Sequence, residues 1–326
     1  MTRRPSPEAL AEGVRTGRRA AIGQAISLVE SRRPSHRALA DALLEALPPP
    51  EEPAFRLGIS GPPGVGKSTF IEAFGWARLE EGHRVAVLAV DPSSVRTGGS
   101  ILADKTRMAR LSMDERAFVR PSPSGGSLGG VSRRTREAMQ VVEAAGFDVV
   151  IIETVGVGQS ETAVAQMVDS FLLLMLAGAG DDVQGIKRGI LEWADLLAIT
   201  KSDGDNQTRA GNAANDLRSA LSIFLPENAP WTPPVRTCSA MNGDGLGQLW
   251  EDLGQHRDTM TKLGLFEDRR RQQRVQWFRE ELEAQMREDL RRRTDLESVE
   301  QQVEAGVLAP GVAARRVLEL DVGTTS

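Results

Sequence analysis

The segment that most constrains the fold is a glycine-rich motif at residues 61–68, Gly-Pro-Pro-Gly-Val-Gly-Lys-Ser. It matches the pattern G-x-x-x-x-G-K-[ST], and it lies between an apolar segment and a helix-forming one, as a phosphate-binding loop requires. The glycines let backbone N–H groups turn toward a β-phosphate at the positive end of the helix. In this interpretation Lys67 neutralises the β- and γ-phosphates, and the Ser68 hydroxyl is a ligand for Mg²⁺. The predicted phosphate-binding residues are Gly61, Pro62, Pro63, Gly64, Val65, Gly66, Lys67, Ser68 and Thr69.

Short apolar segments alternate with longer helix-forming segments from residue 55 onward. Several of the apolar segments are nearly continuous in Val, Ile and Leu, as expected for strands buried on both faces of a mostly parallel sheet. The alternation is typical of βαβ units, so we expect an α/β P-loop NTPase fold. Its doubly wound, mostly parallel sheet would be flanked by helices, with ligands at the carboxyl ends of the strands. The predicted strands are 56–60, 84–90, 117–120, 148–152, 170–177, 195–200 and 234–239, and the predicted helices are 67–80, 130–145, 186–194, 205–222 and 246–262.

Helical extensions are expected on both sides of this α/β domain. Residues 5–47 are predicted to form two helices, before three prolines at 48–50 end the pattern. Residues 267–297 are predicted to form one long helix with an apolar stripe; their closely mixed charges favour a solvated or dimerising helix over a nucleic-acid arm. The predicted domains are an N-terminal helical extension at 1–50, a P-loop domain at 51–265 and a C-terminal helical dimerisation arm at 266–326.

The sequence Thr200-Lys201-Ser202-Asp203 follows a predicted strand and resembles the N/T-K-x-D motif that reads guanine. The Asp203 carboxylate can accept hydrogen bonds from guanine N1–H and the exocyclic amine, whereas adenine presents an acceptor at N1. The stem of Lys201 can lie along the base. Thr200 stands where Asn is commoner, and that Asn usually ties this loop to the phosphate-binding loop. Ser239 and Ala240 resemble the second base loop, where a backbone N–H meets guanine O6, so we expect GTP and GDP as ligands.

Acidic residues at the ends of strands are candidates for the Mg²⁺ site. Glu153 ends a predicted strand in Glu-Thr-Val-Gly, in the place of the usual D-x-x-G switch, where Gly156 can sense the γ-phosphate. Asp91 directly follows another strand and Asp104 comes soon after it; each is either a metal-proximal carboxylate or a helix cap or surface charge. The candidate metal ligands are therefore Ser68, Asp91, Asp104 and Glu153.

Two further loops carry candidate catalytic residues. Val157 stands where many regulatory GTPases have a water-orienting Gln, and Gln159 is either its substitute or a polar loop residue. The sequence therefore predicts slow hydrolysis that a partner stimulates. The polar, glycine-rich loop at 178–188 follows the central strand and is placed to move with nucleotide state.

Composition limits the classes of partner and the cellular compartments that are expected for this chain. The formal net charge is −5, which gives no global basic field for nucleic acid or an anionic membrane. Cys238 is the single cysteine, which fits a reducing compartment. No apolar segment of the sequence is long enough to span a bilayer. We expect no secretory signal, because the basic residues near Met1 are not followed by an apolar segment. We therefore expect a cytoplasmic location.

Together these motifs resemble the MeaB/ArgK family of chaperone GTPases. The segments that carry the resemblance are Gly17-Arg-Arg-Ala20, Leu28-Val-Glu-Ser31, residues 58–68, Val90-Asp-Pro-Ser-Ser94, Gly98-Gly-Ser-Ile-Leu102, Asp104-Lys-Thr-Arg-Met108 and Glu153 to Glu161. It implies a homodimer that assembles through the C-terminal arm and binds adenosylcobalamin-dependent methylmalonyl-CoA mutase. It also implies that the protein gates cofactor loading, that it protects the mutase from inactivation, and that the mutase stimulates GTP hydrolysis. By the same resemblance, the loop around Gln184 and Lys187 is a third switch, and the catalytic set is Lys67, Glu153, Gln159 and Lys187.

Three other functions remain open at this stage. A GTPase that inserts nickel or another metallocofactor would need soft or imidazole ligands, and the three histidines, His36, His83 and His256, are scattered. A small-molecule kinase could use the same phosphate-binding loop, although Asp203 and the switch-like segment Glu153–Gly156 favour a GTPase that changes state on hydrolysis. A scaffold with a purely structural nucleotide is the third.

Overall fold

The computed structural model describes residues 5–90, 108–121, 128–154, 160–178, 188–224, 226, 228–292 and 296–319. It divides into two units, Met1–Gln273 and Arg274–Ser326, and each is described by itself.

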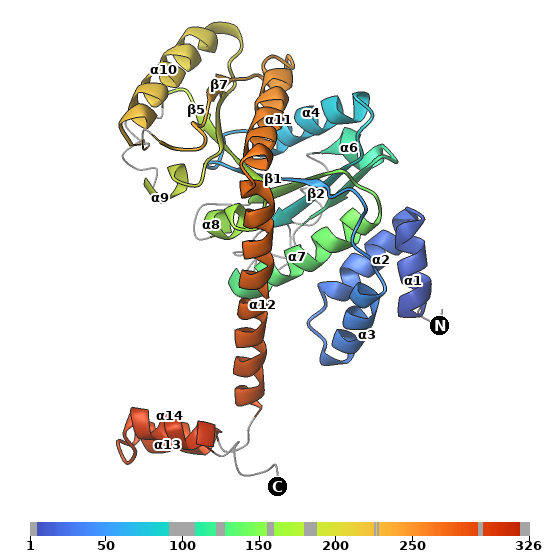
Figure 1. Ribbon diagram of the computed structural model, residues 1–326, viewed down its shortest axis with the longest axis vertical. Coiled ribbons are helices and arrows are strands. Elements are labelled where there is room, and N and C mark those ends of the chain that lie inside the picture. The colour runs from blue at the N-terminus through green and yellow to red at the C-terminus, as the bar shows by residue number, and fades with distance from the viewer. Residues whose placement is uncertain are drawn as a thin grey trace. The chain divides into compact units, whose positions relative to one another are not determined.

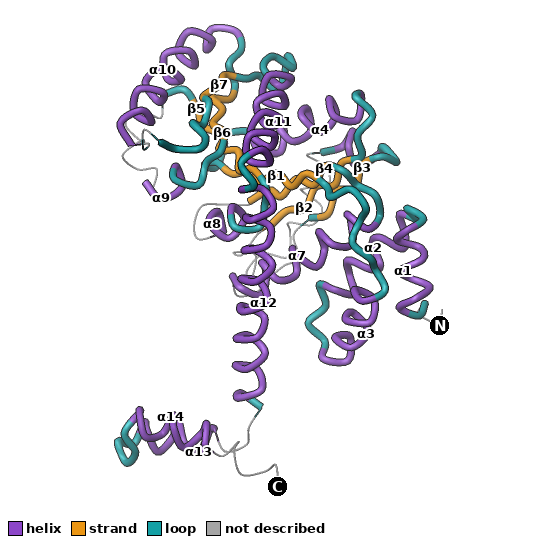
Figure 2. The backbone as a smooth tube through the Cα atoms, viewed as in Figure 1, coloured by secondary structure: helices purple, strands orange, loops and turns teal. Residues whose placement is uncertain are grey.

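The first unit is built around a seven-stranded sheet with the order β3-β2-β4-β1-β5-β6-β7 (Figure 2). Every strand pair is parallel. The predicted α/β P-loop fold is confirmed, and each predicted strand is present with shifts of one or two residues at its ends. The strands are β1 (Phe55–Ser60), β2 (Val85–Val90), β3 (Ala117–Arg120), β4 (Val149–Thr154), β5 (Ser170–Leu176), β6 (Leu196–Thr200) and β7 (Val235–Thr237).

Helices cover both faces of the sheet, which makes it doubly wound (Figure 1). Leu172 and Leu174 of β5 pack in one apolar cluster with α4 (Lys67–Glu80) and α11 (Leu246–Lys262). Their neighbours Leu173 and Met175 point to the other face and pack with α10 (Gln207–Phe224). The remaining helices between strands are α6 (Ala109–Met113), α7 (Leu128–Ala144), α8 (Ser160–Ala165) and α9 (Arg188–Leu191).

The N-terminal extension has three helices, so the prediction of two was wrong. They are α1 (Pro7–Arg15), α2 (Arg19–Val29) and α3 (Pro34–Glu45). Gly17, with φ of 69°, turns the chain between α1 and α2, a backbone conformation that glycine adopts without steric cost. Ser6 caps α1 by accepting a hydrogen bond from the N–H of Ala9. The turn at Gly17 and the cap at Ser6 define α1 as a separate helix, whereas the apolar periodicity of residues 5–47 alone suggested fewer helices.

Arginine side chains bond to backbone carbonyls of both outer strands. Arg19 of α2 donates to the carbonyl of Ala117 in β3 at 2.6 Å. Arg218 of α10 donates to the carbonyl of Val235 in β7 at 2.6 Å. The N–H of Val85 bonds instead to the carbonyl of Arg116, one residue earlier than Ala117. Since successive carbonyls alternate in direction, Ala117 presents its carbonyl on the side of β3 away from β2.

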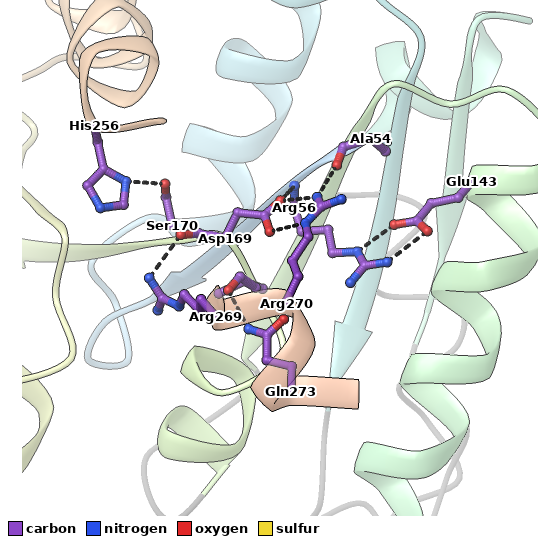
Figure 3. A network of polar contacts seen from close by, with 10 residues as sticks. Ala54, Arg56, Glu143, Asp169, Ser170, His256, Arg269, Arg270 and Gln273 are labelled. Carbon is purple, nitrogen blue, oxygen red and sulfur yellow. Dashed lines mark hydrogen bonds and ion pairs between the residues drawn. The ribbon is translucent and has the colours of Figure 1, made fainter. Parts of the chain in front are cut away.

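The start of α12 (Leu265–Arg291) is fixed to the amino end of the sheet by buried charges (Figure 3). The Arg270 guanidinium donates to both carboxylate oxygens of Asp169, which directly precedes β5, and to the carbonyl of Ala54. The Asp169 carboxylate also accepts from the backbone N–H of Arg56 at 2.8 Å, and the Arg56 side chain pairs with Glu143 of α7. Asp169 and Arg270 are almost completely buried. This pair therefore connects β1, β5 and α12.

A second part of this network surrounds His256 of α11 (Figure 3). His256 Nδ1 lies 2.7 Å from Ser170 Oγ, and its Nε2 lies 3.4 Å from Asp195 Oδ1. The Asp195 carboxylate accepts from the N–H of Phe171 and faces Arg269 at 3.4 Å. Although burial acts to raise it, the adjacent imidazole of His256 and the charge of Arg269 hold the pKa of Asp195 below its ordinary value.

The second unit contains the rest of α12 together with α13 (Leu296–Glu304) and α14 (Pro310–Glu319). The long helix predicted for 267–297 is present, but α12 ends at Arg291 and a separate helix begins at Leu296. Leu290, Val299 and Val317 belong to a small apolar cluster that joins the three helices. The predicted apolar stripe of α12 is largely exposed in the single chain, namely Val275, Phe278, Leu282 and Met286.

Candidate nucleotide site

The phosphate-binding loop lies between β1 and α4, at the carboxyl end of the sheet, as the motif predicts. The chain passes so close to β5 that a Cβ on Gly61 would lie 2.4 Å from the carbonyl oxygen of Leu174. Gly66 directly precedes α4 with φ of 93°. Both positions therefore require glycine, and Val65 between them is fully buried and anchors the loop in the core.

Lys67 is the first residue of α4, and its ammonium curls back over the loop. It donates to the carbonyl of Gly61 at 2.6 Å and to that of Pro62 at 3.3 Å. Burial lowers the pKa of Lys67, while the carboxylates of Glu153 and Glu161 act in the opposite direction. The ammonium thus lies inside the loop with two acidic groups around it, where an arriving phosphate can replace the carbonyl contacts.

Ser68 and Glu153 lie together, as predicted for the metal site. The Ser68 hydroxyl donates to Glu153 Oε1 at 3.2 Å, although the two residues come from α4 and β4. Glu153 is almost completely buried and Ser68 is partly buried. A hydroxyl and a carboxylate are the hard oxygen donors that Mg²⁺ prefers, so these residues fit the predicted ion.

The predicted base-reading loop, which begins at Thr200, is tied to the phosphate-binding loop by two side chains. Thr200 Oγ1 donates to the carbonyl of Val65 at 2.8 Å and also lies 3.3 Å from the carbonyl of Met175. Lys201 Nζ donates to the carbonyl of Gly64 at 2.8 Å. Thr200 therefore makes the connection that the commoner Asn would make, so this departure from the motif preserves the link between the loops.

Asp203 is held by the second base loop. Ser239 Oγ donates to Asp203 Oδ2 at 2.6 Å, and Ser239 is fully buried. The Ser202 N–H bonds to the carbonyl of Cys238, which joins the two loops through the backbone as well. Ala240 follows Ser239 and is partly exposed. The structure thus brings Asp203 and the predicted loop 239–240 together, with one carboxylate oxygen of Asp203 already oriented.

Three residues near the site were missed by sequence reasoning. Ser60 and Glu161 are hydrogen-bonded to one another beside the phosphate-binding loop at 3.4 Å. Asn206 donates from Nδ2 to the carbonyl of Lys201, whose backbone has a left-handed φ of 57°. Ser60 could have been found as the last residue of the strand that enters the loop. Glu161 ends the segment 153–161 on which the family resemblance rests, although it was not predicted as a site residue, and nothing in the local spacing marks Asn206.

The other predicted site residues lie outside the described part of the chain. They are Asp91, Asp104, Gly156, Gln159 and Lys187. Most of the segments 91–107, 154–161 and 178–188, which we expect GTP and Mg²⁺ to order, also lies outside the described residues.

The described histidines do not gather around a common point. His36 lies beside Ser31, His83 beside Asp148 and His256 beside Ser170. Within the described ranges, no three His, Cys, Asp or Glu side chains are grouped so that they could hold a metal ion. Nor is any described helix long and apolar enough to cross a membrane.

Comparisons with known proteins agree with this geometry. A family model described as methylmalonyl Co-A mutase-associated GTPase MeaB matches residues 22–295. GTPase ArgK of Escherichia coli is 48% identical over 317 residues, which cover 95% of this chain and 96% of that protein. The mitochondrial methylmalonic aciduria type A homolog of Mus musculus is 44% identical and is matched over 94% of this chain and 77% of its own length.

One solved structure resembles the whole chain. The crystal structure of a protein named LAO/AO transport system kinase superposes with a TM-score of 0.75 at 40% sequence identity. The match covers 98% of this chain and 99% of that one.

Proposed function

Since the chain belongs to the family of methylmalonyl-CoA mutase-associated GTPases, we propose that it is a chaperone for an adenosylcobalamin-dependent methylmalonyl-CoA mutase. In this proposal, GTP hydrolysis gates the loading of the cofactor and protects the mutase from inactivation.

The observation that carries the GTP assignment is the link between the two halves of the site. Asp203 lies at the base end and Lys67 at the phosphate end, and Thr200 and Lys201 join their loops. A nucleotide that fills both ends would gain from two parts that are already aligned, which is the advantage of a preorganised site. The acceptor-only carboxylate of Asp203 selects guanine over adenine, because adenine has no N1–H to donate.

In this proposal, the predicted site residues divide the hydrolytic work. Lys67 neutralises phosphate charge, while Ser68 and Glu153 would hold Mg²⁺ together with Asp91 and Asp104. When bound, the ion would offset the negative charge that develops on the phosphates. Gln159 and Lys187 complete the proposed catalytic set. A water molecule attacks the γ-phosphorus, the bond from that phosphorus to the bridging oxygen of the β-phosphate breaks, and GDP and phosphate leave.

The partner assignment is supported by names among the relatives. The matching family is described as mutase-associated, and the mouse relative is named for methylmalonic aciduria. The exposed stripe of α12, Val275, Phe278, Leu282 and Met286, supports a homodimer, since exposed apolar side chains at helical spacing favour an interface. The second unit also contains an apolar groove of about 580 Å³, which is lined by residues that include Val303 and Leu318.

The buried single thiol of Cys238 supports a reducing compartment, and we place the protein in the cytoplasm.

GTP turnover measured with and without purified mutase tests the proposal. We expect the mutase to raise the rate by at least about tenfold, as partner proteins do for slow GTPases. Lys67→Ala should abolish GTP turnover with and without the mutase, and it should also remove protection of the mutase. If the nucleotide were purely structural, protection would survive this substitution. A turnover rate indifferent to the mutase would contradict the partner, and transfer of labelled phosphate to a small molecule would instead indicate a kinase.

A further inference from the structure

A chain of side-chain hydroxyls links two ends of one segment beside the phosphate-binding loop. Thr154 is the last residue of β4 and Glu161 is the second residue of α8, so they bracket residues 155–160. Thr154 Oγ1 donates to Ser60 Oγ at 2.8 Å, and the Ser60 hydroxyl donates in turn to Glu161 Oε1 at 3.4 Å. Ser60, the last residue of the strand that enters the phosphate-binding loop, is therefore hydrogen-bonded to both Thr154 and Glu161.

The positions of Ser60, Thr154 and Glu161 give their hydrogen bonds a role beyond filling the core. Ser60 and Thr154 are completely buried, and each is the final residue of a central strand. Ser60 directly precedes the phosphate-binding loop. Buried hydroxyls have to be paired, so the positions of the two strand ends are coupled. The α8 helix is also fixed to β1 by packing, because a Cβ on Gly58 would meet Val164 at 3.0 Å.

We propose that Glu161 is a positioning residue for GTP hydrolysis, acting through Ser60 to fix Thr154, and with it Glu153, relative to Lys67 and Ser68. Glu161 does not touch the reacting atoms in this proposal. It rests on the assignment of the phosphate site under the proposed function. In-line attack depends on the geometry of groups around the γ-phosphate, so a small displacement of Glu153 would slow the reaction more than it weakens binding.

Three variants separate the hydrogen bonds from the charge. Ser60→Ala breaks the chain and keeps the carboxylate, Glu161→Ala removes the acceptor, and Glu161→Gln removes the charge while its amide oxygen still accepts from Ser60. Single-turnover GTP hydrolysis, GDP affinity and the thermal midpoint would be measured for each, with Ser219→Ala, on the exposed side of α10, as a matched serine control.

We expect Ser60→Ala and Glu161→Ala each to slow hydrolysis by about tenfold while GDP affinity changes by less than about twofold. Glu161→Gln should retain most of the rate. The double variant Ser60→Ala/Glu161→Ala should be no slower than either single variant, because both break the same chain.

Several results would overturn the proposal. They are unchanged hydrolysis in Ser60→Ala, a multiplicative loss in the double variant, or an equal loss in Glu161→Gln and Glu161→Ala. Lys67→Ala distinguishes this failure from failure of the site itself. If Lys67→Ala bound GTP as tightly as the parent, the phosphate-site assignment would be wrong. If Lys67→Ala bound GTP more weakly while the Ser60 and Glu161 variants gave one of the results above, only the role of Glu161 would be wrong.

Discussion

At the scale of single residues, Thr200 shows that the first position of the N/T-K-x-D motif can change from Asn to Thr and keep its contact with the phosphate-binding loop. Its β-branched side chain is shorter than the commoner Asn, yet the hydroxyl bonds to the carbonyl of Val65. The sequence alone does not predict this contact, because it depends on the distance between two loops that are far apart in the chain. Asp203, in contrast, could be identified from the sequence, since the spacing of its motif after a strand determines its place.

Thr200→Val should weaken GDP binding by about tenfold, because leaving the Val65 carbonyl without its donor costs about 1–3 kcal/mol. Titration of a fluorescent GDP analogue would measure the change. Thr200→Ser keeps the hydroxyl and serves as the control, with affinity close to that of the parent. Equal affinities for Thr200→Val and the parent would contradict the link between the loops.

Cys238 should resist alkylation in the folded protein. The residue is almost completely buried, and burial raises the pKa of its thiol to about 12, so the reactive thiolate is scarce at neutral pH. Iodoacetamide should react at least about 100-fold faster in urea than in buffer. Because the chain has a single cysteine, mass spectrometry follows this thiol without interference. Comparable rates in the two conditions would refute its burial.

At the scale of elements, the central strands were the most predictable features. Runs such as Phe171 to Met175 are apolar on both faces, and that composition fits little except a strand in a covered parallel sheet. The N-terminal helices were less predictable, because Gly17 ends one helix within a continuous periodic pattern. The buried network at the amino end of the sheet could not be predicted, since Arg56, Asp169 and Arg270 meet only after folding.

Arg270→Met should lower the free energy of unfolding by about 3–5 kcal/mol, because it leaves the buried Asp169 carboxylate without its partner. Urea denaturation followed by circular dichroism would measure the loss. The adjacent Arg271 offers a matched control, since its ion pair with Asp268 is exposed. Arg271→Met should change stability by less than about 1 kcal/mol. Similar losses for both variants would argue against the Asp169–Arg270 pair.

The lowered pKa of Asp195 predicts acid sensitivity of the same region. A carboxyl group with a depressed folded-state pKa stabilises the fold above its unfolded pKa, and this contribution is lost as pH falls through the folded value. The stability difference between the parent and Asp195→Asn should therefore be constant at neutral pH and shrink below about pH 4. Urea titrations at several pH values would show this. A difference that persisted into strong acid would contradict the assignment.

At the scale of the whole molecule, the chain combines a nucleotide-binding unit with a second, helical unit. The described residues of the candidate site all belong to Met1–Gln273, whereas the exposed apolar stripe belongs to Arg274–Ser326. The sequence predicted an arm from its composition, because apolar residues recurred every three or four positions among charges. It did not predict that α13 would begin at Leu296, since helix periodicity continues on both sides of that point.

Phe278→Glu should prevent self-association, because it places a charge in the middle of the stripe, where the parent has a 65% exposed aromatic ring. Light scattering should give a mass near 35.3 kDa for the variant and twice that for the parent. Ala284→Glu adds the same charge on the opposite side of α12 and should leave the dimer intact. A parent that is itself monomeric would refute the proposed assembly.

The arginine contacts on β3 and β7 limit how this molecule can associate with others. An open sheet invites further strands at its two borders, and this is a common route to swapped or fibrillar aggregates. Here Arg19 occupies an outward carbonyl at one border, and Arg218 does the same at the other. Each arginine therefore takes up one backbone acceptor that an added strand would need, which disfavours growth of the sheet at both borders.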